Sequence, residues 1–294
     1  MRRRPTLVLA TVTCVALSAC GGGGDDDAST TSAAPVDDTT TSTARSEPDG
    51  VEIGATVWFA GFELTFGSAT YEPARRTVTI ETAFENTGAS SANVDASFLL
   101  DSSGQSYELD RFGSERPSVP GGRTGSGSLA FTVVGPFSFD DAVLTVGSPA
   151  VQQASVPLGS EGELVTLEPR SLEITGSATA GQLSVDVHGG ELRADVPETH
   201  RQTEAGTLAL TIDLDITNSG TGGGGYAFGP DNLALTRPDG ATIAEDDGPI
   251  ELLGHQVTLP DQQVRFVVED PTEGTYVLLI REGDLEGQLE FEID

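Results

Sequence analysis

Residues 211–220 read TIDLDITNSG. Every second residue from Leu208 to Ile216 is apolar, which is the period-2 pattern of a strand with one buried and one wet face. The pattern ends at Asn218 and Gly220, residue types that can take the positive φ of a tight turn. The stretch therefore predicts a β-strand with apolar residues in a core, aspartates in water and a turn at its end.

The same pattern occurs earlier in the chain. Residues 79–88 read TIETAFENTG, which repeats the Thr-Ile start and the Asn-x-Gly end. A strand-and-turn unit that recurs after 132 residues indicates two related domains in tandem. The chain of 294 residues is long enough for two domains of about 100–130 residues, each with its own core.

Short alternating segments separated by Gly, Pro and Asp turns fill both halves of the chain, and sustained helical spacing is missing. About seven short strands per half predict an all-β protein made of two tandem antiparallel β-sandwiches. Trp58, the single tryptophan, is expected in the first core, with a ligand platform as the alternative. We expect a signal peptide at residues 1–19 and a tether at residues 20–50. A first domain at residues 51–158 is then followed by a junction at residues 159–171 and a second domain at residues 172–294.

The N-terminus has the features of an export signal. Three arginines precede an apolar segment, residues 6–16, that is too short to span a bilayer. The following Leu-Ser-Ala-Cys ends at Cys20 and resembles the bacterial lipobox, which implies cleavage before Cys20 and acylation of its thiol. The acyl chains would then hold the protein to membrane lipid on the extracytoplasmic side. The alternative is an ordinary secretory peptide with a chance cysteine.

Residues 21–50 are rich in Gly, Thr, Ser and Asp and contain no aromatic residue. Such a segment cannot bury enough apolar surface to offset its chain entropy, so it predicts a disordered tether. Once the signal is removed, Cys20 is the only cysteine left. An internal disulfide is then impossible, and both domains must be held by core packing alone.

These features together resemble one family. The chain resembles the actinobacterial secreted immunoglobulin-like family. The resemblance rests on a lipobox and a Thr-rich stalk, followed by a strand that ends in Asn-x-Gly, a Phe/Leu strand and Asp-x-x-Gly. The family includes a small immunogenic mycobacterial antigen and many lipoproteins of unknown function. The resemblance implies immunoglobulin-like β-sandwiches and an extracellular location, with no catalytic residues. This chain departs from the family by its acidity and by a long polar excursion at residues 197–206.

The formal net charge is −31, and all 15 basic residues are arginine. An anionic surface of this size repels nucleic acid and anionic lipid headgroups, which excludes nucleic acid as a general partner. The acidity is compatible with a salt-rich habitat, and the use of arginine is equally compatible with GC-rich coding DNA. The sequence leaves both explanations open.

Only His188, His200 and His255 could serve as a catalytic base or as histidine ligands of zinc. No G-x-S-x-G elbow accompanies them, and no third metal ligand follows at the usual spacing. Residues 220–225 satisfy G-x-G-x-x-G, but no helix signal follows, so we expect a flexible loop rather than a dinucleotide site.

Calcium is a second metal hypothesis, because hard cations prefer several oxygen ligands from turns. The candidate ligands are Asp101, Asp239, Glu245, Asp246 and Asp247. None matches the order of an EF-hand, and the alternative is that these residues form solvated acidic loops.

The sequence thus favours a lipid-anchored extracytoplasmic protein that binds or scaffolds an envelope protein or glycan without catalysis. The alternative is an envelope hydrolase or metalloenzyme that uses His188, His200 or His255. Convergence of the three histidines in one cleft would favour the enzyme, and their dispersal would favour the binding protein.

We predict that Cys20→Ala releases the protein from the membrane fraction or leaves it unprocessed, because the thiol that receives the lipid is gone. Fractionation of cells and the mass of the N-terminal peptide measure this. Normal processing with unchanged membrane retention would show that Cys20 is not lipidated.

Overall fold

The computed structural model describes residues 49–222 and 225–294. These residues form antiparallel β-sheets and one short 3-10 turn, and they contain no α-helix. The prediction of an all-β sandwich fold is therefore confirmed. The predicted signal peptide, Cys20 and nearly all of the tether lie outside the described residues. None of the described elements is a helix of the length and apolarity needed to cross a membrane.

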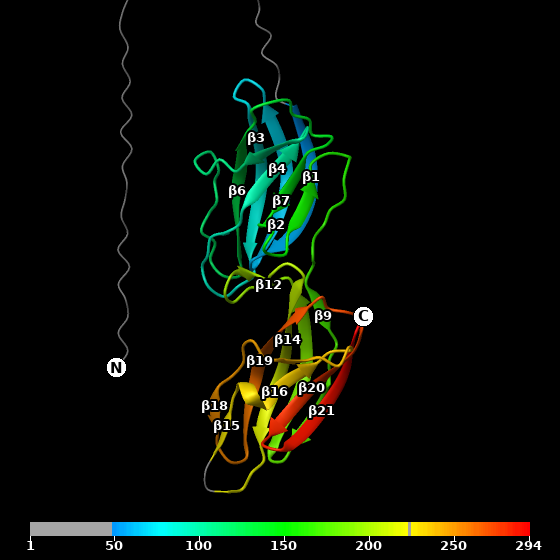
Figure 1. Ribbon diagram of the computed structural model, residues 1–294. Coiled ribbons are helices and arrows are strands. Elements are labelled where there is room, and N and C mark those ends of the chain that lie inside the picture. The colour runs from blue at the N-terminus through cyan, green and yellow to red at the C-terminus, as the bar shows by residue number, and fades with distance from the viewer. Residues whose placement is uncertain (1–48, 223–224) are drawn as a thin grey trace, which may run out of the picture. The chain divides into compact units, whose positions relative to one another are not determined.

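The first sandwich consists of two four-stranded sheets (Figure 1). One sheet has the order β1-β2-β3-β6, with bounds Asp49–Phe59, Phe62–Glu72, Thr77–Asn86 and Arg123–Thr132. The other has the order β5-β4-β7-β8, with bounds Gln105–Glu108, Phe98–Ser102, Val143–Val146 and Ala154–Pro157.

The second sandwich repeats this plan with additions. Its larger sheet has the order β10-β11-β14-β19, with bounds Gly176–Ala180, Leu183–Arg193, Thr207–Asn218 and Val257–Glu269, and β9 (Arg170–Leu172) also pairs with β11. The facing sheet has the order β17-β16-β20-β21, with bounds Thr242–Ala244, Leu233–Thr236, Gly274–Glu282 and Leu285–Ile293. Two additional hairpin pairs are β12 with β13 and β15 with β18, with bounds Asp195–Val196, Arg201–Gln202, Tyr226–Phe228 and Glu251–Leu253.

The two sandwiches have the same strand order once the additional pairs are set aside. The strands β1, β2, β3 and β6 correspond to β10, β11, β14 and β19, and β5-β4-β7-β8 correspond to β17-β16-β20-β21. The repeated sequence forms the third strand of each copy, β3 and β14. The connection between the second and third strands differs, since β2 and β3 are joined by a short turn whereas β12 and β13 stand between β11 and β14.

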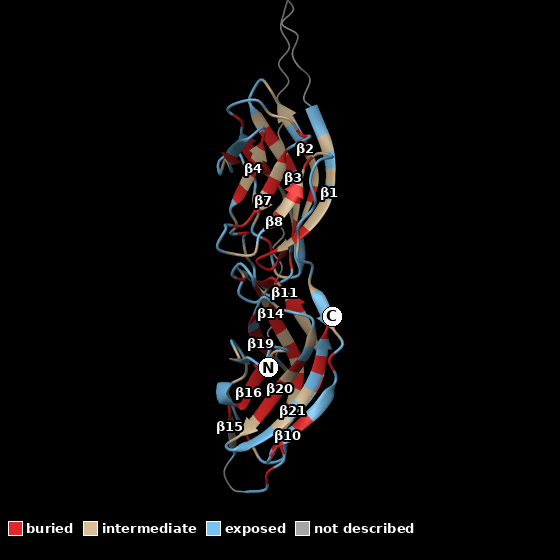
Figure 2. Cartoon of the chain, turned by 45° about the vertical axis from the view of Figure 1, so that its right-hand side comes forward, coloured by how far each residue is buried: buried red, intermediate tan, exposed pale blue. Residues whose placement is uncertain are grey.

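Each sandwich has its own hydrophobic core, and Figure 2 shows the buried residues alternating along the strands. In β14 the side chains of Ile212 and Leu214 are fully buried, whereas Asp213 and Asp215 are partly exposed. The predicted alternation of core and wet residues is confirmed. Burial of a Leu or Ile side chain contributes roughly 1.5–3 kcal/mol, so a one-residue slip in register would be strongly unfavourable.

The Asn-x-Gly ends of the two repeats work differently from the prediction. Neither the asparagines nor the glycines have positive φ. Instead Asn86 is fully buried and donates from Nδ2 to the carbonyls of Ser90 and Val119, both at 2.8 Å, while its Oδ1 accepts from Gly88 N. Asn218 repeats the arrangement in the second sandwich. The motif thus ties a strand end to a neighbouring loop and satisfies buried backbone groups.

The prediction for Trp58 is wrong. Val57 and Phe59 are buried in β1, and Trp58 between them is only partly buried. Successive side chains of a strand point to opposite faces, so Trp58 lies on the other face of the sheet, opposite Glu63 of β2.

We predict that Leu214→Asp lowers the free energy of unfolding by several kcal/mol, because it places an unpaired charge in the core. Asp213→Asn is the matched control on the adjacent residue. Asn keeps an acceptor for the 2.8 Å hydrogen bond from Gln263, so the change should stay within about 0.5 kcal/mol. Urea titration of both variants measures the difference, and equal effects would contradict the assigned faces of β14.

Candidate functional site at the junction of the two sandwiches

The polar excursion at residues 197–206 begins in the hairpin formed by β12 and β13, and this hairpin contacts the first sandwich. Its residues meet the turn between β1 and β2 and the loops that follow β3 and β7. The sequence marks the excursion as unusual. It does not reveal the contact, because the partners are 134 and 142 residues apart in the chain.

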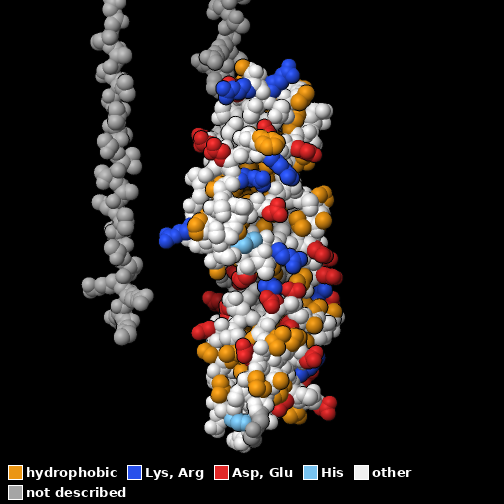
Figure 3. All heavy atoms as spheres, turned by 90° about the vertical axis from the view of Figure 1, so that its left-hand side faces the viewer, with side chains coloured by type: hydrophobic (Ala, Val, Ile, Leu, Met, Phe, Trp, Pro, Cys, Tyr) orange, Lys and Arg blue, Asp and Glu red, His pale blue; other side chains and the backbone are white. Residues whose placement is uncertain are grey.

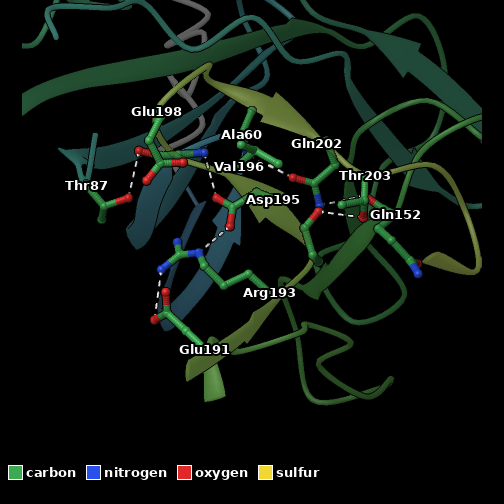
Figure 4. Close-up of polar contacts among 12 residues, drawn as sticks. Ala60, Thr87, Gln152, Glu191, Arg193, Asp195, Val196, Glu198, Gln202 and Thr203 are labelled. Atoms are coloured by element: carbon green, nitrogen blue, oxygen red, sulfur yellow. Dashed lines mark hydrogen bonds and ion pairs between the residues drawn. The ribbon is translucent and has the colours of Figure 1, made fainter. Parts of the chain in front are cut away.

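A buried carboxylate is at the centre of this contact (Figure 4). Asp195 is 1% exposed, and its Oδ2 accepts a hydrogen bond of 2.6 Å from the backbone N–H of Gly61. Its Oδ1 accepts from Nε of Arg193 at 2.7 Å. A buried charge is costly unless it is paired and hydrogen-bonded, and Asp195 is both. One carboxylate thus joins the two sandwiches.

Arg193 is itself anchored on its second side, where Nη1 donates to Glu191 at 3.3 Å. Desolvation alone lowers the pKa of Arg193, but the hydrogen bonds and charges of Asp195 and Glu191 raise it overall. The guanidinium therefore stays charged and holds the carboxylate in place. These residues also line a cavity of about 270 Å³ that reaches Arg265.

A second group of hydrogen bonds lies beside the first (Figure 4). Gln202 accepts from Ala60 N at 2.8 Å through Oε1 and donates from Nε2 to Gln152 O at 3.1 Å. Backbone pairing continues from there, since Gln152 N donates to Thr203 O and Ala205 N to Ala150 O. The hairpin therefore satisfies backbone groups of two separate loops of the first sandwich.

Two glycines let the hairpin come this close. A Cβ at Gly88 would lie 2.4 Å from Pro197 O and 2.6 Å from Cε1 of His200, and a Cβ at Gly61 would lie 2.9 Å from the same two residues. The imidazole of His200 packs on Phe62 with ring centroids 5.6 Å apart, and its Nε2 is 3.2 Å from Ser90 Oγ. Any residue with a Cβ atom at these two positions would push the hairpin away.

The corresponding turn of the second sandwich is closed from within. There Gln182, the counterpart of Gly61, donates from its backbone N–H to a carboxylate oxygen of Glu282 on β20. Ser219 N also donates to Gln182 O, as Thr87 N does to Gly61 O. A carboxylate thus caps the same turn in both copies, and only in the first copy does it come from the other sandwich.

The three predicted histidines have different surroundings. Nε2 of His188 lies 3.2 Å from Asp215 on the outer face of the sheet, and the pKa of Asp215 is lowered by the backbone N–H of Asp261 and by His188. His200 belongs to the junction, and His255 is exposed in the turn between β18 and β19. The described contacts do not bring them together.

The predicted calcium ligands lie in three different parts of the structure, at residues 101, 239 and 245–247. Asp101 is in the first sandwich and accepts from Ser106, and Asp239 pairs with Arg237. Asp246 and Asp247 both pair with Arg265, at 3.1 and 2.9 Å. Among residues 49–222 and 225–294 no group of three His, Cys, Asp or Glu side chains has metal-binding geometry. Calcium binding by these residues stays a prediction.

Glu245 differs from its acidic neighbours because it is partly buried. Desolvation, followed by the charges of Asp247 and Asp231, raises its pKa to about 6. Its Oε2 is buried and has no hydrogen-bond partner among the described residues.

Comparison with known proteins adds little to this geometry. No protein family model matches the chain, and no curated protein matches it. One similar solved structure is the crystal structure of the conserved domain protein from Bacillus anthracis, with 9% identity and a TM-score of 0.22. The similarity covers 83% of this chain and 90% of the other.

We predict that Gly88→Ala loosens the junction, because its methyl group would overlap Pro197 and His200. Overpacking of this kind costs about 1–3 kcal/mol. The backbone N–H of Gly61 should exchange faster with solvent, which NMR or mass spectrometry measures. Gly67→Ala is the control in the same sandwich, where a Cβ has only one neighbour at 3.9 Å. Equal exchange in both variants would contradict the close contact.

We predict that Glu245→Gln raises the stability at pH 7.5 more than at pH 5. The folded-state pKa of about 6 exceeds the ordinary 4.5, so the charged form is disfavoured in the folded protein. Stability from this group is present below pH 4.5 and is lost as the pH rises through about 6. The difference should be about 1 kcal/mol, after allowance for partial exposure. Urea titrations of both proteins at the two pH values measure it, and a pH-independent difference would contradict a raised pKa.

Proposed function

We propose that this chain is a lipid-anchored extracytoplasmic protein that binds or scaffolds an envelope protein or glycan without catalysis. The observation that carries the proposal is the junction, where Asp195 and Gln202 join the two sandwiches through buried and part-buried hydrogen bonds. A protein that presents a surface to a partner gains affinity when that surface is fixed before binding. The junction supplies such fixation without a disulfide.

The proposed location at the membrane rests on the N-terminal sequence. The resemblance of residues 17–20 to a lipobox supports an acyl anchor at Cys20, and the polar segment up to residue 48 supports a tether. A tether of this length typically reaches on the order of 30 Å. The sandwiches would then work close to the membrane surface, within the envelope.

The rival function, a hydrolase or metalloenzyme, depends on the histidines acting together. His188 faces Asp215, His200 packs on Phe62, and His255 is exposed in a turn. Their separate surroundings favour binding over catalysis as the role of the chain.

The test is capture of envelope material by the full-length chain, purified in detergent and immobilised through a C-terminal tag. Washed envelope fragments are applied, and retained proteins and sugars are identified by mass spectrometry. We expect saturable retention that survives replacement of all three histidines by glutamine. Absence of saturable retention would overturn the binding function, and retention that requires the histidines together with turnover of the captured material would favour the enzyme.

A further inference from the structure

Beside the junction, arginine side chains line two adjoining cavities. One, of about 560 Å³, is lined from both sandwiches and includes Arg111 and Arg201 together with His200. The other, of about 540 Å³, is lined by Arg111 and Arg116. Because Arg111 and Asp95 line both cavities, the two form one continuous surface. We call it the arginine groove.

The charge of this groove is opposite to that of the protein. Asp95 is the only carboxylate among the residues that line the two cavities, against three arginines. None of these arginines takes part in an ion pair among the described residues, whereas Arg75, Arg193, Arg237, Arg265 and Arg281 all do. Five of the eleven described arginines have an ion pair, so the distinguishing feature of the groove is that three arginines without one lie together.

The acidic residues are concentrated on the other side of the junction. Residues 159–294 contain 27 Asp or Glu and six Arg, whereas residues 49–158 contain 13 and five. Figure 3 shows arginine side chains on the face of the first sandwich and beside a histidine. Three arginines and one carboxylate in the lining give the groove a local excess of positive charge, which favours an anionic ligand even on an acidic protein.

The loop that carries Arg111 is fixed at its base. Ala130 of β6 accepts from Asp110 N at 2.8 Å and donates its own N–H to Ser114 Oγ at 2.9 Å. Asp110 Oδ1 in turn accepts from Phe112 N at 2.9 Å. The backbone that carries Arg111 is therefore fixed before any ligand arrives, which lowers the entropy lost on binding.

Phe112 stands next to Arg111 at the tip of this loop and is fully exposed. An exposed aromatic ring offers an apolar face on which a ligand ring can pack. Anionic groups along a chain would match the row of arginines, and C–H faces of sugar rings would match the phenyl ring. A ligand that offers both is an anionic polysaccharide.

We propose that the arginine groove binds a polysaccharide with carboxylate or phosphate groups, with Arg111, Arg116 and Arg201 holding the anions and Phe112 packing on a sugar ring. The proposal rests on the binding function proposed above and names its ligand class. It also gives the junction a role, because Arg201 and His200 reach the groove only when the hairpin is docked on the first sandwich.

The experiment measures binding of carboxymethyl dextran, dextran phosphate and unmodified dextran to the full-length chain in detergent. The shared backbone makes the anionic group the only difference between the three probes. We expect binding of one or both anionic dextrans and none of the neutral polymer. The stronger of the two anionic probes tells whether the ligand carries carboxylate or phosphate.

Two variants separate charge from packing. Replacing Arg111, Arg116 and Arg201 by Gln should weaken binding at least tenfold and should lower the slope of log affinity against log salt by about two. Phe112→Ser should weaken binding severalfold and leave the salt slope unchanged. The matched control replaces Arg75, Arg76 and Arg281 by Gln, which removes the same charge away from the groove and should change affinity less than twofold. Thermal melting checks that all variants are folded.

Equal losses of affinity in the groove and control variants would overturn the proposed binding by the arginine groove. Failure of the wild-type chain to bind either anionic dextran would also overturn it. The capture experiment distinguishes this from failure of the binding function. If the groove variant retains the same envelope material as the wild type, the groove inference falls and the binding function stands. If the wild type retains nothing, the binding function falls.

Discussion

A single buried carboxylate joins the two halves of this protein. Asp195 comes from the second sandwich, and both of its oxygens are used, one by an amide of the first sandwich and one by Arg193. Removing either donor would leave a charge in a low-dielectric environment, which costs far more than the net gain from one hydrogen bond. The junction is therefore sensitive to small changes, and the glycines at 61 and 88 are required by the same close approach.

The sequence was informative about whatever depends on neighbours in the chain. The period-2 alternation around Ile212 identifies a strand and its buried face, because the side-chain direction in a strand is fixed by parity. Parity also explains the error at Trp58, because its neighbours Val57 and Phe59 take the inward positions of β1. The end of a strand was predicted correctly at Asn86. The hydrogen bonds of its side chain were not predicted, because one of them goes to the carbonyl of Val119, which is 33 residues away.

The contact between the two sandwiches could not be predicted from neighbouring residues in the chain. Nothing local distinguishes Asp195 from the other acidic residues of a chain with 46 of them, and its partner Gly61 is 134 residues away. The acidic loops illustrate the same difficulty, because the spacing of Asp246 and Asp247 says nothing of Arg265, which pairs with both. The signal that could have led to the junction was the insertion itself. The excursion occurs in only one of the two repeats, and it is the segment that contacts the other repeat.

The hydrogen bond from Gln182 N to Glu282 has a consequence for assembly. In the first sandwich the same turn amide is satisfied by a hairpin from the next unit along the chain, and a contact of this head-to-tail kind can in principle be repeated without limit. In the second sandwich Glu282, on the facing sheet of the same sandwich, accepts from this amide. Because Glu282 already accepts from it, the amide is not a free donor for a hairpin of the kind that docks on the first sandwich.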